Sequence, residues 1–342
     1  MKKGAQILRL QAAILCAGAL VTSCGRAQGG PSTETIFSGR NIYSPSIVFD
    51  APAGKYKMWY GGWQTQSDYP HDKIYYRESK DASIWSAPTT VLAPDQLPIA
   101  NSHVNDPTVV MQTNAKTKTV QYTMFYTVCV NPCTKNANNQ IWSSVSSDGL
   151  TWKFNKPLIL HSGAAVPSVV LLKGSDPAIW RVYFSRTSEA NDAPKRIYAV
   201  DVNGDRDPVG AEQAVFTHKG AGVIANPEVR QVGWSWHLLF NVYHKQAGAK
   251  RDTGDIYLVS SDSPIRFSSA SARPLVENDP GHALCASVAP ALLTIGNKLL
   301  LQFGQANYQR NGVCDFSVFH SLRQVRADTA WLEKGYLRTS EP

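Results

Sequence analysis

Five prolines recur along the chain at nearly even intervals of 62, 60, 60 and 63 residues: Pro45, Pro107, Pro167, Pro227 and Pro290. Each proline opens a short apolar segment. A second segment that ends in aromatic or polar residues follows it, as in 58–63 (MWYGGW) and 124–126 (MFY). Repeats of this length that hold several short strands are typical of β-propeller blades. We therefore predict an all-β fold, a single five-bladed β-propeller with four-stranded antiparallel blades.

The second repeat shows the expected plan of one blade. Strand A opens at 106, strand B covers 120–128, strand C covers 141–146 and strand D covers 157–160. Between strands C and D, residues 147–152 (SDGLTW) combine an Asp and a Gly that suit a turn with a Trp that fills the blade. The first and fourth repeats follow the same order of segments.

The start of the chain matches the strand that the last repeat lacks. Residues 35–39 align with a strand D that leads into strand A of the first blade. We predict that this N-terminal strand completes the fifth blade and closes the ring, because the other strands of that blade come from the C-terminal end. The alternative is that residues 331–337 occupy the same edge.

The first residues resemble a bacterial lipoprotein signal peptide. Lys2, Lys3 and Arg9 precede an apolar stretch over 12–21 that is too short to span a bilayer, and the sequence VTSC ends at Cys24. This sequence fits a lipobox, at which the cysteine becomes lipidated. An ordinary signal peptide with a chance cysteine is the alternative.

Three segments follow from this interpretation. Residues 1–23 are the predicted signal peptide, residues 24–33 are the lipidated Cys and a Gly-rich flexible tether, and residues 34–342 are the propeller domain. The expected location is the bacterial cell envelope, where the lipid-anchored chain is periplasmic or associated with the outer membrane.

Four cysteines remain after the signal peptide and the lipidated Cys are set aside: Cys129, Cys133, Cys285 and Cys314. An even number of cysteines outside the cytoplasm favours disulfides, and we predict the pairs Cys129–Cys133 and Cys285–Cys314. A zinc site is the alternative, but no His lies at ligand spacing from either pair.

The charge and the motif content narrow the classes of partner. The formal net charge of +8 falls by three, to +5, without Lys2, Lys3 and Arg9, and no run of Lys or Arg resembles a nucleic-acid-binding stripe. The excess suits an acidic polysaccharide or an anionic membrane surface. No phosphate-binding loop, dinucleotide fingerprint, zinc-protease motif or nucleophile elbow is present. We predict a monomer with no cofactor, no metal and no nucleic-acid partner.

Strand A of each blade lines the axis of a propeller, so the residues beside the five prolines are candidates for the site. The residue after the proline is small in four repeats, but it is Glu228 in the fourth. The residue before the proline is a carboxylate only at Asp106. Residues two apart on a strand face the same way, so both carboxylates are expected to face the channel. Asp106 also suits a turn, and Arg230 could simply neutralise Glu228.

Polar and aromatic residues at the ends of strands are expected to surround this channel. Some flank the strand A prolines and others end strand B, and Arg230 shares a face with Glu228. The candidate substrate-binding residues are His103, Asn105, Asn226, Trp63, Arg186, His244 and Arg230.

Three motifs carry a resemblance to a known group. They are Asp-Pro at 106–107, MWYGGW at 58–63 and SSDGLTW at 146–152. With the five repeats, the chain over 34–338 resembles the arabinanase, invertase and levansucrase group, that is glycoside hydrolase families 43 and 32. The resemblance implies hydrolysis of a polysaccharide.

These families use three carboxylates, and the present chain departs from that set. An Asp before the first-blade proline is the base or nucleophile, a second Asp tunes pKa values, and a Glu is the acid. The first-blade position is Ser44 here, the third-blade position is Val166, and Glu228 follows its proline where family 43 usually places Glu before it.

Two functions of different class follow. The first is a glycosidase that acts on a cell-surface or environmental polysaccharide by an inverting mechanism, with Asp106 as base and Glu228 as acid. The alternative is a non-catalytic glycan-binding lipoprotein in polysaccharide export or capture. A scaffold for other envelope proteins is a third interpretation. Convergent carboxylates in an open pocket would favour catalysis, whereas a Glu228–Arg230 ion pair in the channel would favour binding.

Overall fold

The computed structural model describes residues 31–65, 68, 71–113, 119–133, 138–159, 163–172, 179–186, 195–244, 253–278, 284–307, 314–315 and 318–339. Residues 1–30 lie outside this range, so the signal peptide and the lipidation of Cys24 stay predictions. Within the described part, no helix is long and apolar enough to cross a membrane.

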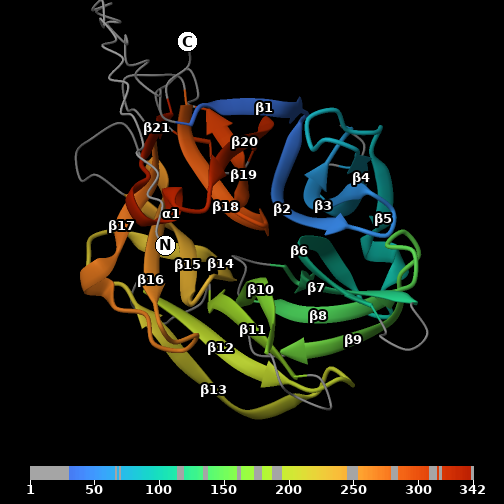
Figure 1. Ribbon diagram of the computed structural model, residues 1–342. Coiled ribbons are helices and arrows are strands. Elements are labelled where there is room, and N and C mark those ends of the chain that lie inside the picture. Colours follow the sequence, from blue (N-terminus) through green and yellow to red (C-terminus); the bar gives the residue numbers. More distant parts are fainter. Residues whose placement is uncertain are drawn as a thin grey trace, which may run out of the picture. The chain divides into compact units, whose positions relative to one another are not determined.

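The strands form five blades around one axis, as Figure 1 shows. Blades 1, 2 and 3 are separate four-stranded antiparallel sheets, whereas blades 4 and 5 belong to one nine-stranded sheet, because a parallel pair of Gly254 with Ala286 joins them. Blade 1 holds β2 (Asn41–Asp50), β3 (Lys55–Trp63), β4 (Lys73–Ser79) and β5 (Thr89–Leu92). Blade 2 holds β6 (Asn101–Thr113), β7 (Val120–Val130), β8 (Asn139–Ser146) and β9 (Lys153–Ile159). Blade 3 holds β10 (Ala164–Leu172), β11 (Ile179–Arg186), β12 (Arg196–Val202) and β13 (Pro208–Thr217). The predicted five-bladed propeller is confirmed.

Blade 4 holds β14 (Val223–Val232), β15 (Ser235–His244), β16 (Thr253–Ser261) and β17 (Arg273–Asn278). Blade 5 holds β18 (Leu284–Ile295), β19 (Lys298–Asn307), β20 (Ser321–Asp328) and, from the other end of the chain, β1 (Thr33–Ser38). Short helical turns lie at η2 (Pro94–Gln96), η3 (Ser269–Ser271) and α1 (Trp331–Lys334).

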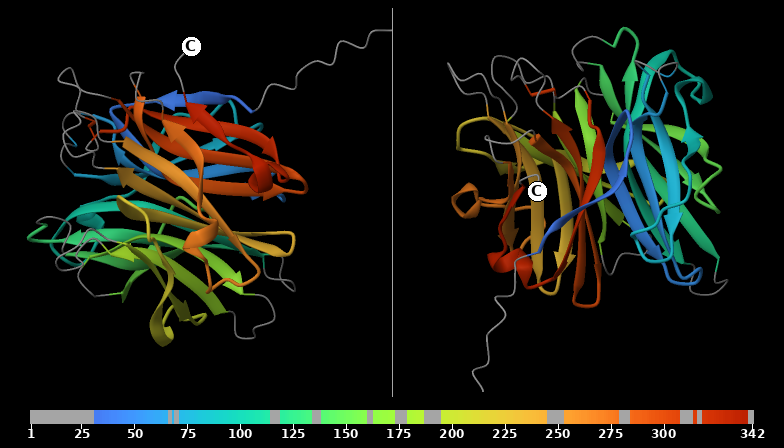
Figure 2. Two further views of the ribbon diagram at one scale, coloured as in Figure 1. Left: turned by 90° about the vertical axis from the view of Figure 1, so that its left-hand side faces the viewer. Right: turned by 90° about the horizontal axis from the view of Figure 1, so that it is seen from above.

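The two ends of the chain meet in blade 5. Strand β1 pairs antiparallel with β20, and Thr33 lies opposite Val325 while Ser38 lies opposite Ser321 (Figure 2). The predicted closure by the N-terminal strand is therefore confirmed. Residues 331–337 do not occupy that edge, because they form α1 and lead into β21 (Leu337–Thr339), which pairs parallel with β17 of blade 4.

Strand A of every blade is interrupted in the same way at its proline. The residue before each proline has a positive φ between 46° and 55°, and the pairing with strand B skips there: Ser44, Asp106, Val166, Asn226 and Ala289. Proline removes one ladder hydrogen bond, and a bulge absorbs the loss. Left-handed backbone at a non-glycine residue costs of order 1–3 kcal/mol. The fold accepts this cost five times, which fixes five equivalent positions around the axis.

The turn between strands C and D anchors the interface of blades 1 and 2. Asp148 Oδ1 accepts hydrogen bonds from the backbone N–H groups of Leu150 and Thr151, and these bonds lower its pKa to about 2 against the opposing effect of burial. The indole Nε1 of Trp59 donates to the carbonyl oxygen of Gly149 at 2.8 Å. Gly149 has a φ of 81°, and a Cβ there would lie 2.8 Å from the Trp59 ring. Glycine is therefore required at this turn.

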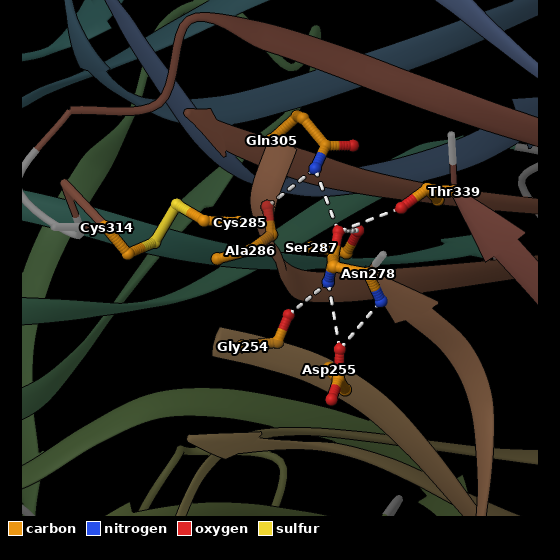
Figure 3. The surroundings of a disulfide bond; sticks show 9 residues. All are labelled: Gly254, Asp255, Asn278, Cys285, Ala286, Ser287, Gln305, Cys314 and Thr339. Carbon is orange, nitrogen blue, oxygen red and sulfur yellow. Dashed lines mark hydrogen bonds between the residues drawn. A yellow bond between two sulfur atoms is a disulfide. The ribbon is translucent and has the colours of Figure 1, made fainter. Parts of the chain in front are cut away.

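Both predicted disulfides are present, as Cys129–Cys133 and Cys285–Cys314. The second lies beside a buried polar cluster around Asn278, which Figure 3 shows. Asn278 Oδ1 accepts hydrogen bonds from Ser287 Oγ, Gln305 Nε2 and Thr339 Oγ1, at 2.9–3.1 Å. This cluster joins the last strand of blade 4 to two strands of blade 5 and to β21.

Candidate functional site

A cavity of about 470 Å³ opens at one end of the propeller axis. It is lined by the start of strand A in all five blades, by ends of strand B, and by residues that begin or precede strand C. We call it the mouth cavity. Below it the axis narrows to a neck of about 20 Å³ that the five X-Pro pairs line. A cavity therefore lies where the sequence predicted the site, at the start of the A strands.

Asp72 lies in the mouth cavity, directly before β4 of blade 1. Its Oδ2 accepts hydrogen bonds from the Tyr43 hydroxyl at 2.5 Å and from Asn105 Nδ2 at 3.2 Å. Asn41 Nδ2 donates to the other carboxylate oxygen at 3.4 Å. Burial raises the pKa of Asp72 to about 6, although these hydrogen bonds oppose the shift. Sequence reasoning did not single out this residue.

Asp106 lies in the same cavity and also lines the neck. Ser44 Oγ donates to its Oδ1 at 2.6 Å. Burial raises the pKa of Asp106 to about 6, and the charge of Asp72 acts in the same direction. The ionised form of Asp106 is therefore harder to reach when Asp72 carries its charge.

Two further side chains of the mouth cavity sit against Asp72. Tyr43 is held protonated, because burial and the charges of Asp72 and Asp106 raise its pKa well above the ordinary value. His103 Nδ1 accepts a hydrogen bond from the backbone N–H of Asp72 at 3.2 Å. Burial lowers the pKa of His103, and the charge of His71 adds to the shift. His103 is therefore neutral at pH 7, with its proton on Nε2.

Asn105 and Asn226 contribute amide groups to the cavity from opposite sides of the ring. Asn105 Nδ2 donates to Tyr43 and Asp72, while its buried Oδ1 accepts no hydrogen bond from any residue that the structure describes. Asn226 Nδ2 donates to Asn241 Oδ1 and to the Tyr243 hydroxyl, both at 2.9 Å. The Asn105 amide group therefore holds Tyr43 and Asp72 in place through its nitrogen, while its oxygen is buried.

Glu228 lines the neck and not the mouth cavity. One of its oxygens lies 2.9 Å from Arg230 and accepts from the backbone N–H of Leu292 at 3.0 Å, and the other accepts from Ser168 Oγ at 2.9 Å. Burial raises its pKa, while the Arg230 charge opposes the shift. The catalytic role of Glu228 stays a prediction, and these contacts favour a structural role.

Arg230 lines the cavity at the other end of the axis, so it does not meet a ligand of the mouth cavity. The remaining predicted residues divide in the same way. Trp63 lines the mouth cavity. Arg186 instead forms an ion pair with Glu212 in blade 3, and His244 lies 3.5 Å from Asp255 in blade 4. The predicted residues that the cavity brings together are Trp63, His103, Asn105, Asp106 and Asn226.

Asp72 and Tyr43 are the main residues that the sequence did not reveal. The one available signal is the position of Asp72, which stands between strands B and C, where the loops were expected to surround the site. Its partners come from 29 to 33 residues away and from two blades, and no local pattern records such contacts.

Several solved structures with a similar fold are named as xylan- or arabinan-degrading enzymes. A xylan β-1,4-xylosidase from Bacillus halodurans C-125 is 16% identical with a TM-score of 0.64, and the match covers 90% of this chain but 57% of that one. An arabinanase from Bacillus subtilis is 12% identical with a TM-score of 0.59, covering 88% and 99%. An α-L-arabinanase from Cellvibrio cellulosa, solved with arabinohexaose, is 11% identical with a TM-score of 0.60, covering 88% and 99%.

The fold is a family 43-type propeller. No family model matches the sequence, and no curated protein matches it. The resemblance noted from the sequence predicted a set of three carboxylates, and the residues of the described site differ from that set. Ser44 hydrogen-bonds Asp106 from the first-blade position, and Val166 and Asn226 occupy the equivalent positions of blades 3 and 4. Among the described residues, the carboxylates that line the mouth cavity are Asp72 and Asp106.

Proposed function

We propose that the protein is a glycoside hydrolase that acts on a cell-surface or environmental polysaccharide in its mouth cavity. The observation that carries the proposal is the pair Asp72 and Asp106, two buried carboxyl groups in an open cavity whose pKa values are both raised to about 6. Glycoside hydrolysis needs one carboxyl group that holds a proton and one that has lost it. The fold is shared with enzymes named for arabinan and xylan.

The two carboxyl groups differ in their hydrogen-bond donors, and this difference assigns their roles. Asp72 accepts from a phenol and two amides, which stabilise its ionised form. Asp106 accepts one hydrogen bond, from Ser44 Oγ, and a hydroxyl can also accept a hydrogen bond from a protonated acid. We assign Asp106 as the acid that protonates the leaving oxygen and Asp72 as the base that activates water. This pair replaces the predicted one of Asp106 as base and Glu228 as acid.

Two observations favour the second function, a non-catalytic glycan-binding lipoprotein. Glu228 and Arg230 form an ion pair in the channel. Ser44 and Val166 also stand at positions where the resemblance to family 43 predicts carboxylates. A cavity with amide and aromatic groups binds sugars without hydrolysing them when no proton is transferred. The two functions differ in one measurable property, which is the release of product.

The test is product release from arabinan, xylan and a panel of bacterial polysaccharides. The variants Asp106→Asn and Asp72→Asn are expected to lose release by about 10²–10⁴-fold, while Glu228→Gln keeps more activity than either. Asp328→Asn, an exposed carboxylate at the end of β20, is the matched control and keeps wild-type rates. Binding of a glycan without release by the wild type would overturn the hydrolase and support the binding protein.

We also propose that the chain is a monomer anchored to the bacterial envelope through a lipid on Cys24. The lipobox ending at Cys24 and the short apolar stretch before it support this location. Cys24→Ser is expected to move the protein from the membrane fraction to the soluble fraction. Unchanged fractionation would refute the anchor and leave the proposed hydrolysis untouched.

A further inference from the structure

The propeller has two ends, and its exposed apolar side chains gather at one of them. Strands A and B, and strands C and D, are joined at the end opposite the mouth cavity, which we call the hairpin end. Among the described residues, seven large apolar side chains are exposed, and six lie at the hairpin end: Ile84, Leu150, Leu171, Val209, Trp234 and Ile295. The seventh, Tyr336, lies at the outer edge of blade 4, where its hydroxyl bonds Glu277.

The individual positions show how strongly these side chains project. Trp234 stands in the turn between β14 and β15 and is 94% exposed. Ile84 stands in the turn after β4 of blade 1 and is 79% exposed. Burial of either side chain against an apolar partner would be favourable, because it would remove apolar area from water. The two residues belong to different blades, so exposed apolar side chains occur across the hairpin end and not on one blade alone.

The centre of this end holds a recess of about 560 Å³ with a mixed lining. Its apolar residues include Val110, Leu171 and Leu293 near the ends of A strands and Trp236 at the start of β15, and its polar residues include Arg230. The exposed side chains of Leu171 and Ile295 flank it. The hairpin end therefore presents exposed apolar side chains around a recess of mixed polarity, and no described part of the chain covers those side chains.

The chain enters the propeller at this same end. Strand β1 starts with Thr33 opposite Val325, toward the end of β20, and finishes with Ser38 opposite Ser321 at the mouth. Eight residues separate Cys24 from Thr33, and a fully extended stretch of that length spans about 30 Å. The tether leaves β1 in the direction of the hairpin end, so a lipid on Cys24 favours an orientation in which this end faces the membrane.

We propose that the hairpin end is a lipid-binding surface that rests on the bilayer, with Trp234 and Ile84 in the headgroup region. Indole rings favour this region because one edge is polar and the rest is apolar. The net charge of +5 for the chain without its basic signal residues adds attraction to anionic lipid. The mouth cavity then opens away from the membrane, toward soluble or cell-surface polysaccharide. The inference uses the proposed lipid on Cys24 but is independent of hydrolysis.

The test uses the lipidated full chain in vesicles of phosphatidylcholine and phosphatidylglycerol, with and without brominated acyl chains that quench nearby tryptophan. The component of fluorescence from Trp234 is the difference between the wild type and Trp234→Phe. We expect brominated lipid to quench more than half of this component, and aqueous acrylamide to quench it less in vesicles than in detergent. No quenching by brominated lipid would overturn the proposal.

Two matched variants in the Trp234→Phe background locate the surface. Ile84→Trp is expected to restore quenching by brominated lipid, because it places an indole at the same end but on another blade. Tyr336→Trp places an exposed indole at the outer edge and is expected to restore none. Equal quenching at both positions would overturn the assignment of the hairpin end. Shielding of Trp234 that rises with protein concentration in detergent would instead show a second copy there, and would also overturn it.

Discussion

Asp106 is buried at the mouth of the propeller, where its ionised form is destabilised. The exchange Asp106→Asn should therefore make the protein more stable at neutral pH, although it removes the proposed catalytic acid. Asparagine suits the site, because it tolerates the left-handed backbone at φ 51° and occupies the equivalent position of blade 4 as Asn226. Its amide oxygen can accept the hydrogen bond from Ser44.

The magnitude follows from the shift in pKa. The pKa of Asp106 rises from 3.8 to about 6, and each unit corresponds to about 1.4 kcal/mol, so the ionised group destabilises the fold by about 3 kcal/mol above pH 6. The folded pKa lies above the unfolded one, so the folded state binds more protons between pH 4 and 6. The stability of the wild type should therefore fall as the pH rises through this window. Asp106→Asn should remove most of that fall.

The assay is urea or thermal unfolding of wild type and Asp106→Asn at pH 4 and pH 7.5. At pH 7.5 the variant should be more stable by about 2–3 kcal/mol, which corresponds to a rise in Tm of about 5 °C. At pH 4 the difference should nearly vanish. Asp328→Asn, whose carboxylate is exposed, should show no such dependence. A stability difference that is the same at both pH values would refute the burial argument.

Three further results are expected from unfolding measurements. Arg230→Met should lower the free energy of unfolding by about 3 kcal/mol, because it leaves the buried carboxylate of Glu228 unpaired. Adding Glu228→Gln to the same chain should recover part of that loss, and additive effects of the two changes would contradict the pairing. Gly149→Ala should lower the free energy of unfolding by about 2–3 kcal/mol, because the new Cβ would meet the Trp59 indole. Gly54→Ala, whose Cβ would have nothing within 4 Å, should lower it by about 1 kcal/mol, and equal losses would contradict the steric cause. Deletion of 33–38 should open the ring and leave the outer edge of β20 unpaired, so sedimentation should show self-association. A stable monomer would contradict the role of β1.

The fold could be predicted because its signals are local and repeated. Each proline marks the same interruption of strand A, so Pro45 and its four equivalents specify the blade period without knowledge of any contact. The strand beginning at Thr33 could be assigned because one blade lacked a partner. The pairing of Cys285 with Cys314 could be predicted from the expected location outside the cytoplasm and from the positions of the four cysteines in the sequence.

The site could be predicted only in part, because its properties arise between blades. Asp106 was found beside its proline, whereas Asp72 acquires its raised pKa from burial among side chains that the ring brings together. Glu228 faces the axis as expected, but the neck separates it from the mouth cavity. The depth of a residue along the axis depends on how five blades close, and the alternation of one strand does not record it.

The left-handed residue before each proline has a consequence for how the activity of such a ring can change. The backbone there is set by the bulge and the proline, and it tolerates Ser, Asp, Val, Asn and Ala at its five occurrences. A single base change that converts Asn226 to Asp, or a short route from Ser44 to Asp, would install a carboxylate on another wall of the mouth without moving the chain. Evolution can thus redistribute acid and base groups around one cavity, or remove them, while the scaffold stays constant.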